Sequence, residues 1–241
     1  MNAPSPDLSV ILPAYEEAEN LIWFLPQLRE ILQKMGVSHE ILVIDTSSPK
    51  DETPQVCRQN GVDYHARAGG DLYSHALKTG IAKTKGRWVV IMDCDGSHDP
   101  TVIPRLWAEK ERADLIIASR YVEGGHTENP AILIGLSLVV NTVFRVVLGL
   151  RCRDVSNSFR LYSGAALRRL QLECANFDIV EEILIKLSMG KSGFAIREIP
   201  FTFGRRRAGH TKRNLFAFAL SYLASLVRFY RMEKRFQLLQ K

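Results

Sequence analysis

The first half of the chain alternates short apolar runs with longer segments whose apolar residues recur at helical spacing. A short apolar run predicts a buried strand, and apolar residues three or four positions apart predict one buried face of a helix. The expected strands are Leu8–Leu12, Glu40–Ile44, Val62–Ala66, Trp88–Met92 and Leu115–Ser119. The expected helices are Ala18–Gly36, Leu72–Thr84 and a further helical stretch before Leu115. The pattern therefore predicts a repeated strand–helix unit.

Apolar strands that alternate with helices indicate an α/β fold with a mostly parallel sheet, covered by helices on both faces. Ligands of such sheets bind outside the carboxyl ends of the strands. The residues that follow the expected strands are Pro13–Glu17, Asp45, Asp93, Asp95 and Arg120. We expect them to share one edge of the sheet.

Two long apolar segments in the second half carry polar residues at helical spacing. Ala131–Leu150 is long enough to span a bilayer, but it has a polar stripe that consists of Ser137, Asn141, Thr142 and Arg145, with Gly149 on the same side. Such a stripe favours a helix that lies in a membrane interface or packs on the domain. Asn214–Phe236 repeats the pattern and ends in the basic residues Arg228, Arg231, Lys234 and Arg235. A membrane-spanning helix is the alternative for the first segment, and an ordinary helix packed on the core, with a solvated basic face, is the alternative for the second.

We therefore expect one α/β domain over residues 1–211, with an amphipathic interfacial helix at 131–150 inside it, and a basic amphipathic helix at 212–241. Charge supports this division. The chain has a net charge of +6, and residues 196–241 hold 11 of its 32 basic residues and 2 of its 26 acidic ones. A basic end indicates phosphates, an anionic membrane surface or nucleic acid as partners. Nucleic acid is disfavoured because the basic residues lack interleaved aromatic side chains for stacking on bases.

Candidate chemistry lies in the stretch WVVIMDCDGSHDP, from Trp88 to Pro100. Residues two apart on an extended chain point the same way, so Asp93 and Asp95 can present oxygens to one hard cation such as Mg²⁺ or Mn²⁺. Such a cation, held with substrate phosphates, would neutralise a leaving diphosphate. A simple polar turn over residues 95–100 is the alternative, because Asp, Gly, Ser and Pro are turn formers. No serine–histidine–aspartate or cysteine–histidine set occurs at informative spacing.

Six segments together resemble a known family. They are VILPAYEEAENL, VIDTSSPKDET, VVIMDCDGSHDP, ASRY, SNSFRLYSG and PFTFGRRRAGHTK, between about Leu8 and Phe229. In this order they resemble the motifs of the family 2 inverting glycosyltransferases, most closely the dolichyl-phosphate mannosyltransferase group, which includes polyprenyl-phosphate glycosyltransferases. The resemblance implies a GT-A fold and transfer of a hexose of mannose or glucose type from a GDP- or UDP-sugar to a polyprenyl phosphate. The two amphipathic segments and the basic end favour an enzyme that acts at the cytoplasmic face of a membrane as a peripheral protein.

The resemblance also assigns roles to individual residues. It implies that Pro13, Tyr15 and Glu17 line the nucleotide pocket and that Asp45 reaches the base or ribose. Asp93 and Asp95 would bind the diphosphate and an Mg²⁺ or Mn²⁺ ion, with Ser97 as a further polar residue of the metal shell. The phosphate-contacting basic residues would be Arg120, Arg206 and Lys212. Of these residues, Asp93, Asp95 and Arg206 are the catalytic candidates.

Several of these residues also have plainer interpretations. Pro13 and Tyr15 could pack at a strand end, Asp45 could cap a turn, and Arg120 could form a salt bridge with an acidic residue at the sheet edge. The run Arg205–Arg207 could be a solvated charge cluster. Two histidines near the site, His98 and His210, are expected to be a turn residue and a loop residue rather than bases. Glu182 aligns with a family glutamate but is expected to lie on a helix surface.

Three departures from the family pattern keep other functions open. The acidic pair after the second strand reads D-T-S-S, the glycine-rich turn reads G-G-D-L-Y-S-H-A-L, and no cation precedes Arg145 in the segment from Ala131. The missing cation, at a place linked to the acceptor phosphate, allows a cytoplasmic glycosyltransferase with a non-lipid acceptor. The D-T-S-S turn allows a nucleotide-binding homologue without turnover. The sequence leaves the sugar, the base, the metal and the oligomeric state open.

Overall fold

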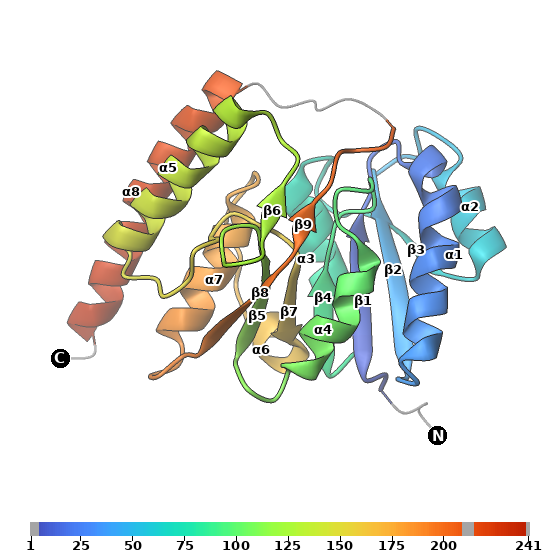
Figure 1. The fold of residues 1–241 in the computed structure, drawn as a ribbon, viewed down its shortest axis with the longest axis horizontal. Helices are drawn as coiled ribbons and strands as arrows, with labels where there is room; N and C mark the ends of the chain where they lie inside the picture. The colour runs from blue at the N-terminus through green and yellow to red at the C-terminus, as the bar shows by residue number, and fades with distance from the viewer. Residues whose placement is uncertain (1–4, 209–214, 240–241) are drawn as a thin grey trace.

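A seven-stranded sheet forms the centre of the computed structural model, which describes residues 5–208 and 215–239 (Figure 1). Its strands are β1 (Leu8–Pro13), β2 (His39–Asp45), β3 (Asp63–Ala66), β4 (Trp88–Ile91), β5 (Leu115–Ser119), β7 (Arg160–Ser163) and β8 (Ile196–Pro200). The spatial order is β3-β2-β1-β4-β7-β5-β8, with β7 antiparallel to both neighbours and the other pairings parallel. A separate parallel pair is formed by β6 (His126–Thr127) and β9 (Thr202–Phe203). The five strands expected from the sequence are confirmed, each within one residue of its expected ends.

Helices cover both faces of the sheet, as the alternation of strands and helices predicts. They are α1 (Ala18–Lys34), α2 (Thr53–Asn60), α3 (Tyr73–Lys83), a 3₁₀ turn η1 (Pro100–Val102), α4 (Ile103–Ala108), α5 (Ala131–Val147), α6 (Gly164–Arg168), α7 (Ile179–Met189) and α8 (Leu215–Leu239). The core on one face packs against α1, α2 and α4, and the core on the other face against α3, α6 and α7. Helices α5 and α8 lie side by side at the end of the molecule opposite α1 and α2 (Figure 1).

The alternation of side chains along β1 explains why its sequence is apolar throughout. Val10 and Leu12 belong to the core under α1, whereas Ile11 belongs to the core under α3. Because successive strand residues point to opposite faces, a strand covered on both sides must be apolar at every position. Helix α3 packs closely at Gly80, where a Cβ atom would lie 2.7 Å from Ile11 Cγ2.

The antiparallel strand β7 brings a further segment to the carboxyl edge of the sheet. Arg160, its first residue, pairs with Ile91 near the end of β4 and with Ile117 in β5. The chain that leads into β7 therefore reaches the edge at which the parallel strands β1, β2, β4 and β5 end. The sequence pattern did not predict this strand, because Arg160 and Ser163 at its ends leave only two consecutive apolar residues in it.

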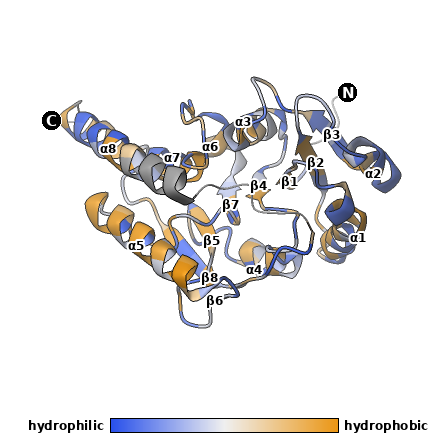
Figure 2. Ribbon diagram, turned by 90° about the horizontal axis from the view of Figure 1, so that it is seen from above, coloured by the Kyte–Doolittle hydropathy of each residue, from blue (hydrophilic) through white to orange (hydrophobic). Residues whose placement is uncertain are grey.

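Helix α5 faces the domain with part of its polar side and faces outward with apolar residues. Asn141 and Phe144 are its buried residues, and Ser137 is half-buried. Its exposed large apolar residues are Ile132, Leu136, Leu138, Val139, Val143, Val146 and Val147. Figure 2 shows these apolar residues along the outer part of the molecule, with α8 as the neighbouring helix. Within residues 5–208 and 215–239, no helix combines the length and the apolar character needed to cross a membrane.

Candidate active site

The turn after β4 directs both aspartates of the D-C-D segment to the carboxyl edge. Asp95 accepts hydrogen bonds at Oδ1 from the Ser97 amide (2.9 Å) and the Ser97 hydroxyl (2.6 Å), so this carboxylate is fixed within its own turn. Gly96 between them has φ +93°, a conformation that favours glycine. The side chain of Asp93 is 27% exposed and that of Asp95 10%. Asp93 is therefore the more accessible of the two carboxylates.

Arg206 links Asp95 to Glu17 across the edge of the sheet. Its Nη2 lies 2.8 Å from Asp95 Oδ2 and its Nη1 lies 3.0 Å from Glu17 Oε1. Glu17, at the end of the turn after β1, also accepts a hydrogen bond of 2.6 Å from the Asn20 amide nitrogen. Glu17, Asp95 and Arg206, which lie up to 189 positions apart in the sequence, thus meet at the edge of the sheet.

The segment that carries Arg206 is attached to the aspartate turn by its backbone. The Gly204 amide donates to the Ser97 carbonyl (3.0 Å), and the Arg207 amide donates to the Asp95 carbonyl (2.9 Å). The Arg207 guanidinium lies 4.2 Å from the centroid of the Trp23 ring, a cation–π contact from α1. The backbone around the basic run Arg205–Arg207 is therefore hydrogen-bonded to the aspartate turn. The run is part of the site and not only a solvated cluster. No pattern in the sequence indicates this contact of Trp23.

Burial and charge act in opposite directions on the acidic groups of the site. Burial raises the pKa of Glu17, in spite of its bond with Asn20 and the charge of Arg206. Burial alone would also raise the pKa of Asp95, but the Ser97 hydrogen bonds and the Arg206 charge outweigh it and lower that pKa. The charges of Asp95 and Glu17 in turn outweigh burial at Arg206 and raise its pKa. Asp95 therefore remains a carboxylate at neutral pH.

His98 supports the aspartate turn from inside the protein. It is 1% exposed and stacks on Phe159 with ring centroids 5.1 Å apart. Its Nδ1 accepts the Asp93 amide at 2.9 Å, so a proton of the neutral ring resides on Nε2. Burial lowers the pKa of His98. His98 is thus a turn residue, as expected, with the added role of fixing the Asp93 backbone.

Tyr15 and its neighbours form a second group at the edge, beside Pro13 at the end of β1. The Lys50 Nζ donates to the Tyr15 hydroxyl at 2.5 Å and lies 4.4 Å from the centroid of the Tyr15 ring. Glu16 has φ +56°, which is rare for a residue other than glycine. Backbone strain of this kind is typical of functional turns. Lys50 lies two residues after the D-T-S-S segment, which departs from the family pattern.

Asp45 is fully buried at the end of β2. Its Oδ2 accepts the Tyr64 hydroxyl at 3.3 Å, and burial raises its pKa. Nearby, the buried Arg67 donates to the carbonyls of Ala14, Asp45, Asp71 and Leu72. Arg67 thereby ties the ends of β1 and β2 to the segment before α3, a role that the sequence did not reveal.

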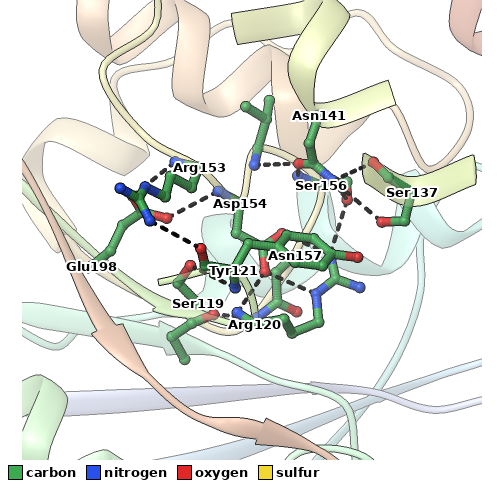
Figure 3. A network of polar contacts seen from close by, with 12 residues as sticks. Ser119, Arg120, Tyr121, Ser137, Asn141, Arg153, Asp154, Ser156, Asn157 and Glu198 are labelled. Atoms are coloured by element: carbon green, nitrogen blue, oxygen red, sulfur yellow. Dashed lines mark hydrogen bonds and ion pairs between the residues drawn. The ribbon is translucent and has the colours of Figure 1, made fainter. Parts of the chain in front are cut away.

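Arg120 is paired with an acidic residue, which was the plainer of its two interpretations. Its Nε lies 2.8 Å from Asp154 Oδ2 and its Nη2 lies 2.6 Å from Asp154 Oδ1, in a bidentate arrangement (Figure 3). Its Nη2 also donates to the Ser156 hydroxyl at 3.0 Å. The side chain of Arg120 is 9% exposed and that of Asp154 is fully buried. A phosphate that contacts Arg120 would therefore meet a guanidinium that is already paired with Asp154.

The expectation that Glu182 lies on a helix surface is wrong. Glu182 is 2% exposed and accepts the backbone amides of Glu173 (2.8 Å) and Cys174 (2.9 Å). Glu181, beside it on α7, is fully buried and accepts the Tyr222 hydroxyl from α8 at 3.0 Å. Both carboxylates are buried because the segments before and after α7 pack over them. The periodicity of a helix does not predict such contacts between segments.

These two glutamates are expected to contribute to stability with opposite pH dependence. Burial raises the pKa of Glu181 to about 7 from an ordinary value of 4.5. Between pH 4.5 and 7 the unfolded chain has lost this proton while the folded chain retains it, so stability falls as pH rises. Over that window the loss is about 3 kcal/mol. Urea unfolding at pH 5 and pH 8 should therefore show Glu181→Gln gaining stability relative to wild type as pH rises.

Glu182→Gln is the matched comparison on the same helix. Burial alone would raise the pKa of Glu182, but hydrogen bonds from Lys186 and from the amides of Glu173 and Cys174 outweigh burial and lower that pKa. Its contribution is present above pH 4.5 and is lost on acidification, so this variant should lose more stability at pH 8 than at pH 4. Equal responses of the two variants to pH would contradict the different environments of the two carboxylates.

The aspartate turn fits a cation that is held jointly with a phosphate ligand. Within residues 5–208 and 215–239, no group of three or more His, Cys, Asp or Glu side chains is arranged to hold an ion alone. Asp93 and Asp95 supply two carboxylates, and Mg²⁺ commonly takes one or two carboxylates together with substrate phosphates. Ser97, expected in the metal shell, is 2% exposed and donates its hydroxyl to Asp95. Lys212 and His210 lie outside the described residues.

Comparison with known proteins follows the same segments. The model of a family described as Glycosyl transferase family 2 matches residues 9–171. A dolichol-phosphate mannosyltransferase of Pyrococcus furiosus is 34% identical over 213 residues, which cover 85% of this chain and 58% of that protein. An undecaprenyl-phosphate mannosyltransferase of Micrococcus luteus is 32% identical, with 84% of this chain and 85% of that protein covered. The chain thus spans less than two thirds of the first relative and most of the second.

Solved structures share the fold. Glucosyl-3-phosphoglycerate synthase of Mycobacterium tuberculosis, in complex with Mn²⁺, UDP and glucosyl-3-phosphoglycerate, superposes with a TM-score of 0.70 at 18% identity. A complex of the same synthase with Mg²⁺ and UDP has a TM-score of 0.70 at 19% identity. These matches cover 93% of this chain and 80% and 79% of the other chains. The expected α/β fold of the GT-A type is confirmed, and identity at this level speaks for the fold alone.

Proposed function

The chain belongs to glycosyl transferase family 2, and on this premise we propose that it transfers a hexose from a nucleotide sugar to a polyprenyl phosphate. Mg²⁺ or Mn²⁺ would be held by Asp93 and Asp95 together with the diphosphate of the donor. The observation that carries the proposal is the meeting of Glu17, Asp93, Asp95 and Arg206 at the carboxyl edge of the sheet. Relatives named as mannosyltransferases of dolichol phosphate and undecaprenyl phosphate support the same acceptor class.

The residues of the site would act by binding and orienting the donor. A divalent cation supplies positive charge that stabilises a departing diphosphate. Arg206 supplies a second cation beside Asp95, and its planar guanidinium is suited to bidentate contacts with phosphate oxygens. Tyr15, beside Pro13, offers a flat ring to the base. We propose that Asp45 reaches the base or ribose, which requires this fully buried carboxylate to become accessible when the donor binds. We propose Lys212 as a further phosphate contact.

The acceptor would be bound on the side of Arg120. A phosphate acceptor carries an anionic oxygen near neutral pH and needs no strong general base, so alignment and electrostatics dominate catalysis. The environment of His98 agrees with this, because its buried ring uses Nδ1 to accept the Asp93 amide. Arg120, paired with Asp154 and 9% exposed, is the cation that we propose for the acceptor phosphate.

The outward face of α5 supports contact with a membrane surface. The seven exposed aliphatic residues of α5 lie beside α8, whose exposed basic residues are Arg228, Arg231, Lys234 and Arg235. Apolar residues next to lysine and arginine are typical of helices that bind anionic lipid surfaces in the plane of the interface. We therefore propose peripheral binding at the cytoplasmic face of the membrane, where a polyprenyl phosphate would be presented.

Charges placed on this face should release the protein from lipid. Val139 and Val146 are 61% and 70% exposed, so Val139→Asp combined with Val146→Asp should leave the fold intact. Because aspartate is costly to bury at a lipid surface, flotation with anionic liposomes should fall about tenfold or more. Ile22→Asp is the control, since Ile22 is 60% exposed on the distant helix α1. Equal flotation of both proteins would exclude α5 as the lipid contact.

Thermal unfolding with nucleotide sugars tests the donor site. A ligand at one hundred times its Kd stabilises the native state by about 2.7 kcal/mol, which for a chain of this size raises Tm by about 5 to 10 °C. We expect this rise for a GDP- or UDP-sugar in the presence of Mn²⁺ or Mg²⁺ and a much smaller one with EDTA. If no nucleotide sugar raises Tm under either condition, the proposed donor site is wrong.

The missing cation before Arg145 leaves a non-lipid acceptor as the second candidate. Flotation distinguishes the two, because an enzyme with a non-lipid acceptor has no need for lipid binding and should remain at the bottom of the gradient. Donor hydrolysis that is lost in Asp95→Ala and retained in Lys110→Ala would exclude a homologue without turnover. Lys110 is a suitable control because it packs on the Trp107 ring, 4.5 Å from the ring centroid, outside the aspartate turn.

A further inference from the structure

Helix α5 is joined to the candidate acceptor side by a buried amide that the proposed function does not use. Asn141 is 2% exposed, although the helix around it is among the most exposed in the described chain. Its Oδ1 accepts the amides of Val155 (2.6 Å) and Ser156 (3.0 Å), which belong to the segment before β7. Its Nδ2 donates to the Ser137 carbonyl (2.7 Å) and to the Ser156 hydroxyl (3.1 Å). Figure 3 shows this group.

The segment from Arg153 to Ser156 is held from two sides by two side chains. Glu198 on β8 accepts the amides of Arg153 (2.7 Å) and Asp154 (2.9 Å), and Asn141 on α5 accepts the next two amides. Four successive backbone donors are thus bound by one carboxylate and one carboxamide. The half with Asp154 is attached to the rigid sheet, whereas the half with Ser156 is attached to the outer helix.

Arg120 depends on both halves of this segment. Asp154 binds its guanidinium in a bidentate arrangement, and the Ser156 hydroxyl accepts its Nη2 at 3.0 Å. The Ser156 hydroxyl also accepts the Asn141 amide, so Asn141 and Arg120 share one oxygen atom. A shift of α5 would therefore move a direct partner of Arg120.

We propose that Asn141 is a positioning residue for Arg120, through which the helix with the exposed apolar face sets the placement of that arginine at the sheet edge. The proposal rests on the proposed function, in which Arg120 contacts the acceptor phosphate and α5 contacts lipid. Asn141 makes no contact with substrate. Asn141 fixes the backbone amides of Val155 and Ser156 and the Ser156 hydroxyl, which is a partner of Arg120. Binding of α5 to lipid acts on Arg120 through these contacts.

Kinetics separate this role from a merely structural one. In Asn141→Ala the acceptor KM should rise about tenfold or more, because Arg120 is less well oriented, while the donor KM stays within about twofold. Flotation with liposomes should be unchanged, since the apolar face is intact. Asn141→Asp keeps an oxygen for the two amides and should fall between Asn141→Ala and wild type. Thr142→Ala, at the exposed neighbouring position, is the control and should resemble wild type.

A double-mutant cycle in urea unfolding tests the coupling without any assay of transfer. If Asn141 positions the partners of Arg120, then Arg120→Gln should cost less stability in Asn141→Ala than in wild type. The cycle with Thr142→Ala in place of Asn141→Ala should be additive. Additivity in the Asn141 cycle would overturn the proposal, and so would an equal rise of donor and acceptor KM. A coupled cycle in a protein that transfers no sugar to lipid would refute the proposed function and leave the coupling established.

Discussion

Asp95→Asn is expected to lower kcat/KM for sugar transfer by about a thousandfold, the largest effect of any single substitution in this chain. The change removes the charge of a carboxylate that would bind both the cation and, through it, the diphosphate. Asparagine is isosteric, and its side-chain oxygen can still accept the Ser97 amide that now lies 2.9 Å from Asp95 Oδ1. The turn should therefore persist, and steady-state kinetics with a labelled donor measure the loss.

Asp99→Asn is the control for this substitution. Asp99 is an exposed carboxylate of the same turn, and its Oδ1 accepts the Thr101 amide at 2.8 Å. Asparagine can make the same bond, so activity should stay within about twofold of wild type. Retention of more than a tenth of wild-type activity in Asp95→Asn would show that this carboxylate is not central to catalysis.

Arg206→Gln should lower kcat by about a hundredfold and at the same time leave the affinity for Mn²⁺ equal or higher. The loss would follow because the substitution removes the proposed contact of Arg206 with the phosphates of the donor. The gain in metal binding follows because Ser97 holds Asp95 Oδ1 and Arg206 holds Asp95 Oδ2, so that a cation and the guanidinium compete for one oxygen. Calorimetric titration with Mn²⁺ and single-turnover kinetics measure the two effects separately.

Arg205→Gln is the matched control next to it. The described contact of Arg205 with Glu128 is made by its backbone amide, at 3.1 Å from Oε2, and survives the substitution. Both kcat and metal affinity should then remain near wild type. A fall in Mn²⁺ affinity in Arg206→Gln would contradict the competition between Arg206 and a cation for Asp95.

The residues of the sheet edge could be predicted from the sequence because their positions follow from local pattern. The expected strands that precede Asp45 and Asp93 are apolar runs, and parallel strands end at the same edge, so both residues could be placed there without any knowledge of contacts. The link from Glu17 and Asp95 to Arg206 needed the family resemblance, since nothing in the composition of the basic run brings it to the sheet.

The partners that hold these residues could not be predicted in the same way. Arg120 pairs with Asp154, which lies 34 residues away in the sequence. Glu182 accepts two backbone amides that lie 9 and 8 residues away. Burial of such charges depends on how the segments before β7 and after α6 pack, which apolar periodicity does not encode. Strand β7 was not predicted because only two of its residues, between Arg160 and Ser163, are apolar.

For α5, the sequence pattern predicted the helix, but only the structure shows which side of the helix faces the domain. The sequence predicts a helix with one polar stripe, and either side of it could face the domain. The hydrogen bonds of Asn141 show that part of the polar stripe faces inward, whereas Thr142 of the same stripe and apolar residues such as Val146 are exposed. An apolar stripe on the outside is the arrangement that a lipid surface, rather than water, would favour.

The central claim is metal-dependent transfer of a hexose to a polyprenyl phosphate at the Asp93–Asp95 turn. It is tested most directly by incubating the protein with labelled GDP- or UDP-hexoses, Mn²⁺ and liposomes that contain undecaprenyl or dolichyl phosphate, followed by extraction into organic solvent. We expect label in the organic phase with wild type and at most background label with EDTA or with Asp95→Asn. Label that stays in the aqueous phase with every donor, or transfer that EDTA leaves unchanged, would contradict the account.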